Sequence, residues 1–205
     1  MKLYTFPGAP NPRRVHIYLA EKGLEIPFER VDIMKRENRR PEFMAKVNPL
    51  GGLPVLELDD GTHLAESVAI CRYLEALHPE PPLFGRSARE QGMIEMWLRR
   101  LELYGMVPVG MVWIHGSPLT KAVVKRQIPE VADQYRQAVA QHYAFLDREL
   151  ATREFIAGAS FSMADILALC TIDFAAQLNG LPIPPDHAHL GRWHRSVSAR
   201  PSASA

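Results

Sequence analysis

The proline-rich segment HPEPPLFG, residues 78–85, limits the possible folds of this chain because the pattern of apolar residues changes there. Before it, short stretches of alternating apolar and polar residues are interleaved with stretches of helical spacing. After it, apolar residues recur at helical spacing alone. Its three prolines make a stiff connection between the two patterns. We therefore predict an α/β domain at residues 1–78, a linker at 79–85 and an all-helical domain at 86–205.

The first domain is predicted to follow the order β-α-β-α-β-β-α. Its expected elements are a strand at 2–6, a helix from Pro10 to a stop at Gly23, a strand at 27–33, a helix at 41–47, a hairpin at 54–66 and a helix at 67–78. Proline is tolerated in the first turn of a helix, and glycine commonly ends one. Asp60-Gly61 is a turn signal between two short strands.

The second domain is predicted to be a bundle of helices. Two apolar stripes at helical spacing are interpreted as core; they contain Met93, Met96, Trp97, Leu101 and Tyr104, and Val131, Tyr135, Ala138, His142 and Phe145. In FSMADI, Ser162 can cap a helix while Asp165 reaches back to the cap N–H. A last helix surrounds Trp193, and the final residues SASA are expected to be frayed.

The charge balance and the cysteines exclude several classes of function. The chain of 205 residues carries 24 Lys and Arg against 23 Asp and Glu, without the basic surplus of nucleic-acid-binding proteins. No apolar run approaches the roughly 18 residues of a membrane-spanning helix. Cys71 and Cys170 lie in apolar helical patterns outside any metal-ligand spacing. We expect small buried cysteines in a cytoplasmic protein with no metal and no nucleic-acid or membrane partner.

The turn FPGAPNP, residues 6–12, joins the first strand to the first helix. The backbone N–H groups at a helix start suit an anionic group. The turn nevertheless contains no Ser, Thr, Cys or Tyr. If it belongs to an active site, a side-chain hydroxyl or thiol does not supply the chemistry there.

Four segments in order carry a resemblance to a known family: APNPRRV at 9–15, NPLGGLPVLELDDG at 48–61, LAESVAICRYL at 64–74 and FIAGASFSMADI at 155–166. Together they resemble the cytosolic glutathione transferases across nearly the whole chain. The nearest resemblance is to fungal and bacterial members that lack the catalytic Tyr, Ser or Cys. It implies a thioredoxin-like domain that binds glutathione and a helical bundle that completes a site for an electrophile. It also implies a homodimer, with glutathione as co-substrate and no resident cofactor.

The resemblance assigns glutathione-binding roles to two stretches of the first domain. Ser67 would hold the γ-glutamyl carboxylate through its hydroxyl and N–H at the start of a helix, and Glu66 would pair with the ammonium. Pro54 resembles the family's cis-proline, after Gly52 and Leu53. Leu53 would then pair its backbone N–H and C=O with the cysteinyl unit.

Basic residues near the first helix and in the following loop have open assignments. Lys35, Arg39 or Arg40 would hold the glycyl carboxylate, and the sequence does not choose among them. Of Arg13 and Arg14, one is expected to point inward and pair with a carboxylate at the domain junction. Neither is assigned to catalysis.

Ala9 occupies the position where serine-type relatives carry their hydroxyl, which leaves three hypotheses. In the first, free N–H groups from Ala9 to Asn11 stabilise the thiolate, and a water anchored by His115 or Ser117 takes the proton. His115 could equally cap or pack at a helix end. In the second, the Asn11 amide contacts the sulfur of a glutathione-dependent disulfide reductase. In the third, the protein binds glutathione without catalysis. The apolar wall for an electrophile would be Met106, Met111, Trp113 and Ile114.

Overall fold

The computed structural model describes residues 1–121 and 123–205, and the chain divides into two compact units. The first unit contains residues 1–83 together with 201–205, and the second contains residues 84–200. The boundary between Leu83 and Phe84 lies inside the proline-rich segment. The second unit is therefore inserted, in sequence, between two parts of the first.

The first unit is built on a four-stranded mixed sheet with strand order β2-β1-β3-β4. The strands are β1 Lys2–Thr5, β2 Phe28–Arg30, β3 Val55–Glu57 and β4 His63–Ala65. β2 runs parallel to β1, with Leu3 opposite Phe28, whereas β3 is antiparallel to both β1 and β4. The predicted order of strands and helices is confirmed, although each strand is shorter than its sequence pattern suggested.

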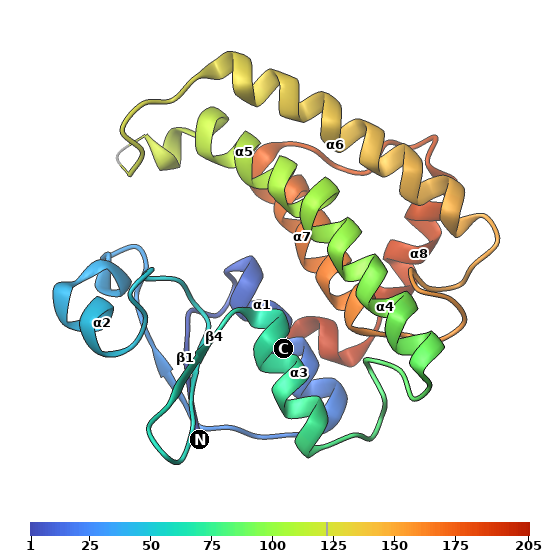
Figure 1. The fold of residues 1–205 in the computed structure, drawn as a ribbon. Coiled ribbons are helices and arrows are strands. Elements are labelled where there is room, and N and C mark those ends of the chain that lie inside the picture. The colour runs from blue at the N-terminus through green and yellow to red at the C-terminus, as the bar shows by residue number, and fades with distance from the viewer. Residues whose placement is uncertain (122) are drawn as a thin grey trace. The chain divides into compact units, whose positions relative to one another are not determined.

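Helices cover both faces of this sheet (Figure 1). α1 (Pro10–Lys22) and α3 (Ser67–Leu77) lie together on one face, and α2 (Pro41–Lys46) lies on the other. α1 ends where predicted, because Gly23 adopts a left-handed conformation with φ of 62°. Cys71 is fully buried on α3, and Cys170 in the second unit is 1% exposed. Both cysteines are free thiols, as expected.

A buried ion pair connects the C-terminal ends of α1 and α3. The Lys22 side chain has 0% exposure, and its Nζ lies 2.6 Å from Glu75 Oε2. Lys22 Nζ also donates to the His78 carbonyl oxygen at 2.8 Å, and the Tyr18 hydroxyl donates to Glu75 Oε2 at 2.6 Å. Burial and the adjacent carboxylate raise the pKa of Tyr18. These contacts fix α1 against α3, and thereby the N-terminal ends that carry the candidate site.

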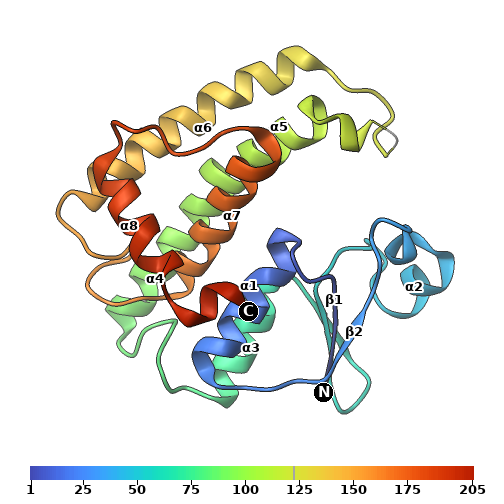
Figure 2. The ribbon, with the colours of Figure 1, turned by 180° about the vertical axis from the view of Figure 1, so that it is seen from behind.

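The segment Pro201–Ser204 forms a 3-10 helix that packs on α1, so the prediction of a frayed end was wrong. Arg13 Nη2 donates to the Ala203 carbonyl oxygen at 3.0 Å. Ser202 is 7% exposed, and its hydroxyl donates to the Glu21 carboxylate. Figure 2 shows this turn beside α1. A short polar sequence is ordered here because α1 supplies both the surface and the hydrogen-bond partners.

The second unit is a helical bundle around α7. Its helices are α4 (Ala88–Leu101), α5 (Val107–Gly116), α6 (Pro129–Leu150), α7 (Met163–Asn179) and α8 (Ala188–Ser198). A π-helical turn at Glu102–Met106 joins α4 to α5, and Pro118–Thr120 is a 3-10 helix. Every residue from Met163 to Ile172 is buried, which places α7 at the centre.

The predicted core stripe along α4 is right for Trp97 and Leu101 and wrong for Met93 and Tyr104, which are 38% and 63% exposed. For Tyr104 the cause is the π-helical turn, because one extra residue in a turn rotates all later side chains around the helix axis. Gly105 is consequently the residue that faces the bundle. A Cβ atom at position 105 would lie 2.7 Å from His142 Nε2, so the close approach requires glycine.

The predicted capping box at the start of α7 is confirmed, and its Asp165 carboxylate also accepts hydrogen bonds from residues outside the box. Asp165 is fully buried and accepts hydrogen bonds from the Ser162 N–H at 2.9 Å and the Ser162 hydroxyl at 3.0 Å. It also accepts from the Ile156 N–H at 2.9 Å and from Trp193 Nε1 at 2.8 Å. One carboxylate therefore joins the preceding loop, the start of α7 and α8.

His142 is 7% exposed on α6, and burial lowers its pKa to about 4. Between pH 6.5 and 4 the unfolded chain binds a proton at this imidazole that the folded chain does not. The contribution of His142 to stability is therefore lost as the pH falls through this window. From pH 7 to pH 4.5 we expect the wild type to lose roughly 2 kcal/mol more unfolding free energy than His142→Gln.

Urea unfolding of both proteins at the two pH values measures this difference. Asp165, whose pKa burial raises to about 6, titrates in the same window in both proteins, so its effect cancels in the comparison. Equal losses in wild type and variant would mean that the folded protein does not disfavour the charged imidazole.

Candidate functional site

The N-terminal end of α1 offers fewer N–H groups than a typical helix start. The Ala9 N–H donates to the Phe6 carbonyl oxygen at 3.2 Å, and Pro10 and Pro12 have none. Arg13 N–H already closes the first helical hydrogen bond, to Ala9 at 2.9 Å. Within the described residues, Asn11 carries the only N–H of this first turn without an acceptor. The expectation of several free N–H groups from Ala9 to Asn11 is therefore corrected to one.

Asn11 also has an unsatisfied side chain. Its Oδ1 atom is buried and has no hydrogen-bond partner within the described part of the chain. Buried amide atoms are nearly always hydrogen-bonded, so such an atom points to a partner outside the protein. Because an amide can turn over, either its oxygen or its NH2 group can meet that partner. Asn11 therefore supplies both polar groups of this helix start.

The N-terminal end of α3 is more open. The N–H groups of Ser67, Val68 and Ala69 have no acceptor among residues 1–121 and 123–205. Glu66, directly before them, is exposed and has a φ of 71°, a conformation rare outside glycine. Such strained residues cluster at functional sites. The turn from β4 into α3 thus presents a hydroxyl, three N–H groups and a carboxylate, as a carboxylate and ammonium ligand requires.

Arg14 also belongs to this site, although the sequence alone gave it no role in binding or catalysis. It is the inward-pointing member of the Arg13–Arg14 pair, with 2% exposure. Its Nη1 donates to Ser67 Oγ at 3.4 Å, which links α1 to the start of α3. A signal was present in the sequence, since Arg14 shares the buried face of α1 with Ile17 and Tyr18. A charged residue on a buried helical face suggests a specific role.

The loop before β3 presents an unpaired peptide unit. The Leu53-Pro54 bond is cis, as predicted. Within the described residues, neither the N–H nor the C=O of Leu53 has a backbone partner. The preceding turn is held by Asn48, which donates from Nδ2 to the Gly52 carbonyl oxygen at 3.0 Å and accepts from the Leu50 N–H at 3.0 Å. Leu53 can therefore pair with an added extended segment.

The basic residues after β2 have partners of their own. Arg39 Nη1 donates to the Leu50 carbonyl oxygen at 2.8 Å, which attaches this side chain to the loop before β3. Lys35 is exposed, with Nζ 3.7 Å from Asp32 Oδ2. Arg40 Nη2 lies 3.4 Å from Glu37 Oε1. Lys35, Arg39 and Arg40 all stay candidates for an anionic group.

Comparison with known proteins identifies the family. The model of the glutathione S-transferase N-terminal domain matches residues 3–82, and that of the C-terminal domain matches residues 129–196. Glutathione S-transferase 2 of Saccharomyces cerevisiae is 39% identical over 205 residues, covering 98% of this chain and 87% of the yeast protein. The chain belongs to the glutathione S-transferase family.

Solved structures agree with the fold of this transferase. A glutathione S-transferase domain-containing protein of Marinobacter aquaeolei VT8 has a TM-score of 0.93 at 40% identity, covering 98% of this chain and 99% of that chain. Gtt2 from Saccharomyces cerevisiae has a TM-score of 0.92 at 39% identity, covering 98% of each chain. The thioredoxin-like N-terminal domain and the helical C-terminal domain are thereby confirmed.

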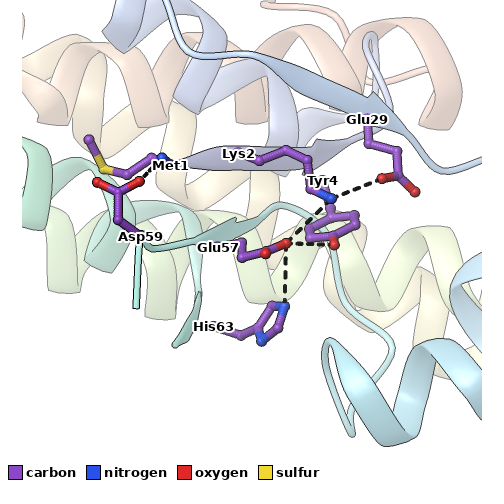
Figure 3. A network of polar contacts seen from close by, with 7 residues as sticks. All are labelled: Met1, Lys2, Tyr4, Glu29, Glu57, Asp59 and His63. Atoms are coloured by element: carbon purple, nitrogen blue, oxygen red, sulfur yellow. Dashed lines mark hydrogen bonds and ion pairs between the residues drawn. The ribbon is translucent and has the colours of Figure 1, made fainter. Parts of the chain in front are cut away.

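Both side-chain hydroxyls on β1 of this transferase, those of Tyr4 and Thr5, have polar partners. The Tyr4 hydroxyl donates to Glu57 Oε2 at 2.7 Å, within a polar network that includes Lys2 (Figure 3). Thr5 is fully buried, and its hydroxyl lies 2.8 Å from His16 Nε2. Both side chains therefore have partners inside the first unit, and neither hydroxyl is left free to take the role of a serine at position 9.

His115 and Ser117 of the transferase end α5 in the second unit. His115 Nδ1 accepts from the Ile128 N–H at 3.2 Å, at the start of α6. Ser117 is 7% exposed, and its Oγ accepts from the Leu119 N–H at 3.3 Å. Both side chains thus contribute to turns. Their proposed contact with a catalytic water stays a prediction.

Among the described residues, no three His, Cys, Asp or Glu side chains gather in a way that would hold a metal ion. No described helix combines the length and the apolar character that crossing a membrane requires.

Proposed function

We propose that this protein catalyses the attack of the glutathione thiolate on a small apolar electrophile. The observation that carries the proposal is the unpaired peptide unit of Leu53, next to the cis bond, in the same unit as the open start of α3. Ser67 and the α3 N–H groups would hold the γ-glutamyl carboxylate, and Glu66 the ammonium. Lys35, Arg39 or Arg40 would hold the glycyl carboxylate.

The thiolate would be stabilised at the start of α1. With two prolines in the first turn, the donors there are the Asn11 N–H and, after an amide turn, its side-chain NH2 group. The helix dipole adds positive potential, and the small Ala9 side chain permits close approach of sulfur. The reaction thus needs no hydroxyl at position 9.

A water would take the thiol proton in this mechanism. Since His115 Nδ1 accepts a hydrogen bond, the neutral imidazole carries its proton on Nε2. His115 would therefore orient such a water by donating to it, and Ser117 is the second candidate. Met106, Met111, Trp113 and Ile114 would form the apolar wall; Ile114 is 36% exposed, and Trp113 packs edge-on against Phe174. We place the enzyme in the cytoplasm, in line with its free thiols. The resemblance to the family implies that it is a homodimer.

A second reaction, glutathione-dependent disulfide reduction, is supported by the unsatisfied Asn11 amide. A third reading, glutathione binding without catalysis, is supported by the absence of a hydroxyl at Ala9.

Ultraviolet absorbance of the bound thiolate, titrated across pH, tests the proposed function. We expect the thiol pKa of bound glutathione to lie below that of free glutathione. Comparing the turnover of aryl halides with the turnover of mixed disulfides then distinguishes glutathione transfer from disulfide reduction. Saturable binding with an unshifted thiol pKa would contradict both enzymatic proposals and favour the binding protein.

Ser67→Ala should weaken glutathione binding by about ten-fold, because a hydrogen bond to a carboxylate is lost. Isothermal titration calorimetry measures the dissociation constant. Ser87→Ala is the matched control, since Ser87 caps α4 in the second unit and its loss removes a cap without touching the proposed site. Equal affinity of Ser67→Ala and wild type would show that the carboxylate binds elsewhere.

A further inference from the structure

A buried guanidinium lies behind the start of α3. Arg14 projects from α1 with 2% exposure, and its Nη1 donates to Ser67 Oγ at 3.4 Å. Its buried neighbours on α1 include Ile17, Tyr18 and the ion-paired Lys22. Burying a charged side chain is costly, so the retention of Arg14 points to a function. The proposed reaction assigns it none.

The chemistry of arginine determines how Ser67 bonds. A guanidinium has donors and no acceptor, so the Ser67 oxygen must accept in this contact. The Ser67 hydrogen then has to point to another acceptor. Within a helix, a serine hydroxyl otherwise tends to bond to nearby backbone groups. Arg14 thereby keeps the Ser67 hydroxyl available as a donor.

The charge of Arg14 acts in the same direction. The positive end of the α3 dipole and the three unused N–H groups already favour an anion at the start of this helix. A guanidinium behind this helix start adds to the same positive potential. The start of α3 is therefore suited to a carboxylate ligand.

We propose that Arg14 is a positioning residue that holds Ser67 as a hydrogen-bond donor and raises the positive potential for the γ-glutamyl α-carboxylate of glutathione. Arg14 acts through Ser67 and does not itself touch the ligand. This inference rests on the proposed function, because it presumes that glutathione binds at the start of α3.

Two ligands and two substitutions test the inference by calorimetry. The ligands are glutathione and its analogue with 4-aminobutanoate in place of the γ-glutamyl unit, which lacks only the α-carboxylate. Arg14→Gln should weaken glutathione binding by about ten-fold and change analogue binding less than two-fold. In the double variant, Arg14→Gln should add little to the loss of glutathione affinity that Ser67→Ala causes alone, since both substitutions act on one contact.

Arg13→Gln is the matched control, because Arg13 neighbours Arg14 on α1 and bonds to Ala203 instead. If Arg14→Gln does not fold, Arg14→Lys carries the same test with a smaller loss for glutathione alone. Equal weakening of both ligands, or additivity with Ser67→Ala, would overturn the positioning role. Wild type that binds neither ligand would overturn the proposed function itself.

Discussion

Ala9→Leu is expected to lower kcat/KM for a standard electrophile by at least about 100-fold while the protein still folds and still binds the γ-glutamyl end of glutathione. Ala9 has φ of −72° and ψ of 142°, which any residue can adopt, and its side chain is partly exposed. A leucine there would occupy the space next to the Asn11 N–H, and a displaced sulfur reacts slowly.

The measurement compares steady-state kinetics with the affinity for S-methylglutathione. Ala20→Leu is the control, because Ala20 is an exposed alanine near the other end of the same helix. Turnover of Ala9→Leu within a few-fold of wild type would mean that the sulfur does not approach the start of α1.

Asp165→Asn should lower the free energy of unfolding by about 3–5 kcal/mol, the largest loss of stability that we expect from a single substitution in the second unit. Its carboxylate accepts from two N–H groups, one hydroxyl and the Trp193 indole. An amide has one oxygen and brings an NH2 group, so some buried donors would lose their acceptor.

Urea unfolding at pH 7 measures this loss. Asp133→Asn is the control, because the Asp133 side chain is 71% exposed beside Arg136. A surface pair of this kind contributes less than about 1 kcal/mol. Similar losses in the two variants would show that the Asp165 network is not a major source of stability.

Local signals predicted most of the fold. Gly23, the Asp60-Gly61 turn and the Ser162–Asp165 box each specify the end, turn or start of an element through contacts a few residues apart. The stripe through Tyr104 failed because a π-helical turn changes the helical register without a local sequence signal. The ordered segment at 201–204 was missed because its partners lie on α1, far away in sequence.

The candidate site was partly predictable. Ser67, Glu66 and the cis Leu53-Pro54 bond followed from the resemblance, and their exposed or unused polar groups match those roles. The single N–H at the start of α1 could have been read from the sequence, since Pro10 and Pro12 cannot donate. The Arg14–Ser67 contact could not, because it joins two helices that the sheet brings together.

The return of residues 201–205 to α1 affects how the transferase can be dissected. A fragment of residues 1–83 would lack the segment that accepts from Arg13 and buries Ser202 against α1, the helix where we propose that the sulfur binds. A minimal glutathione-binding protein would have to carry both pieces, residues 1–83 and 201–205, joined by a designed connection. The second unit is an insertion, and its removal leaves two chain ends to be rejoined.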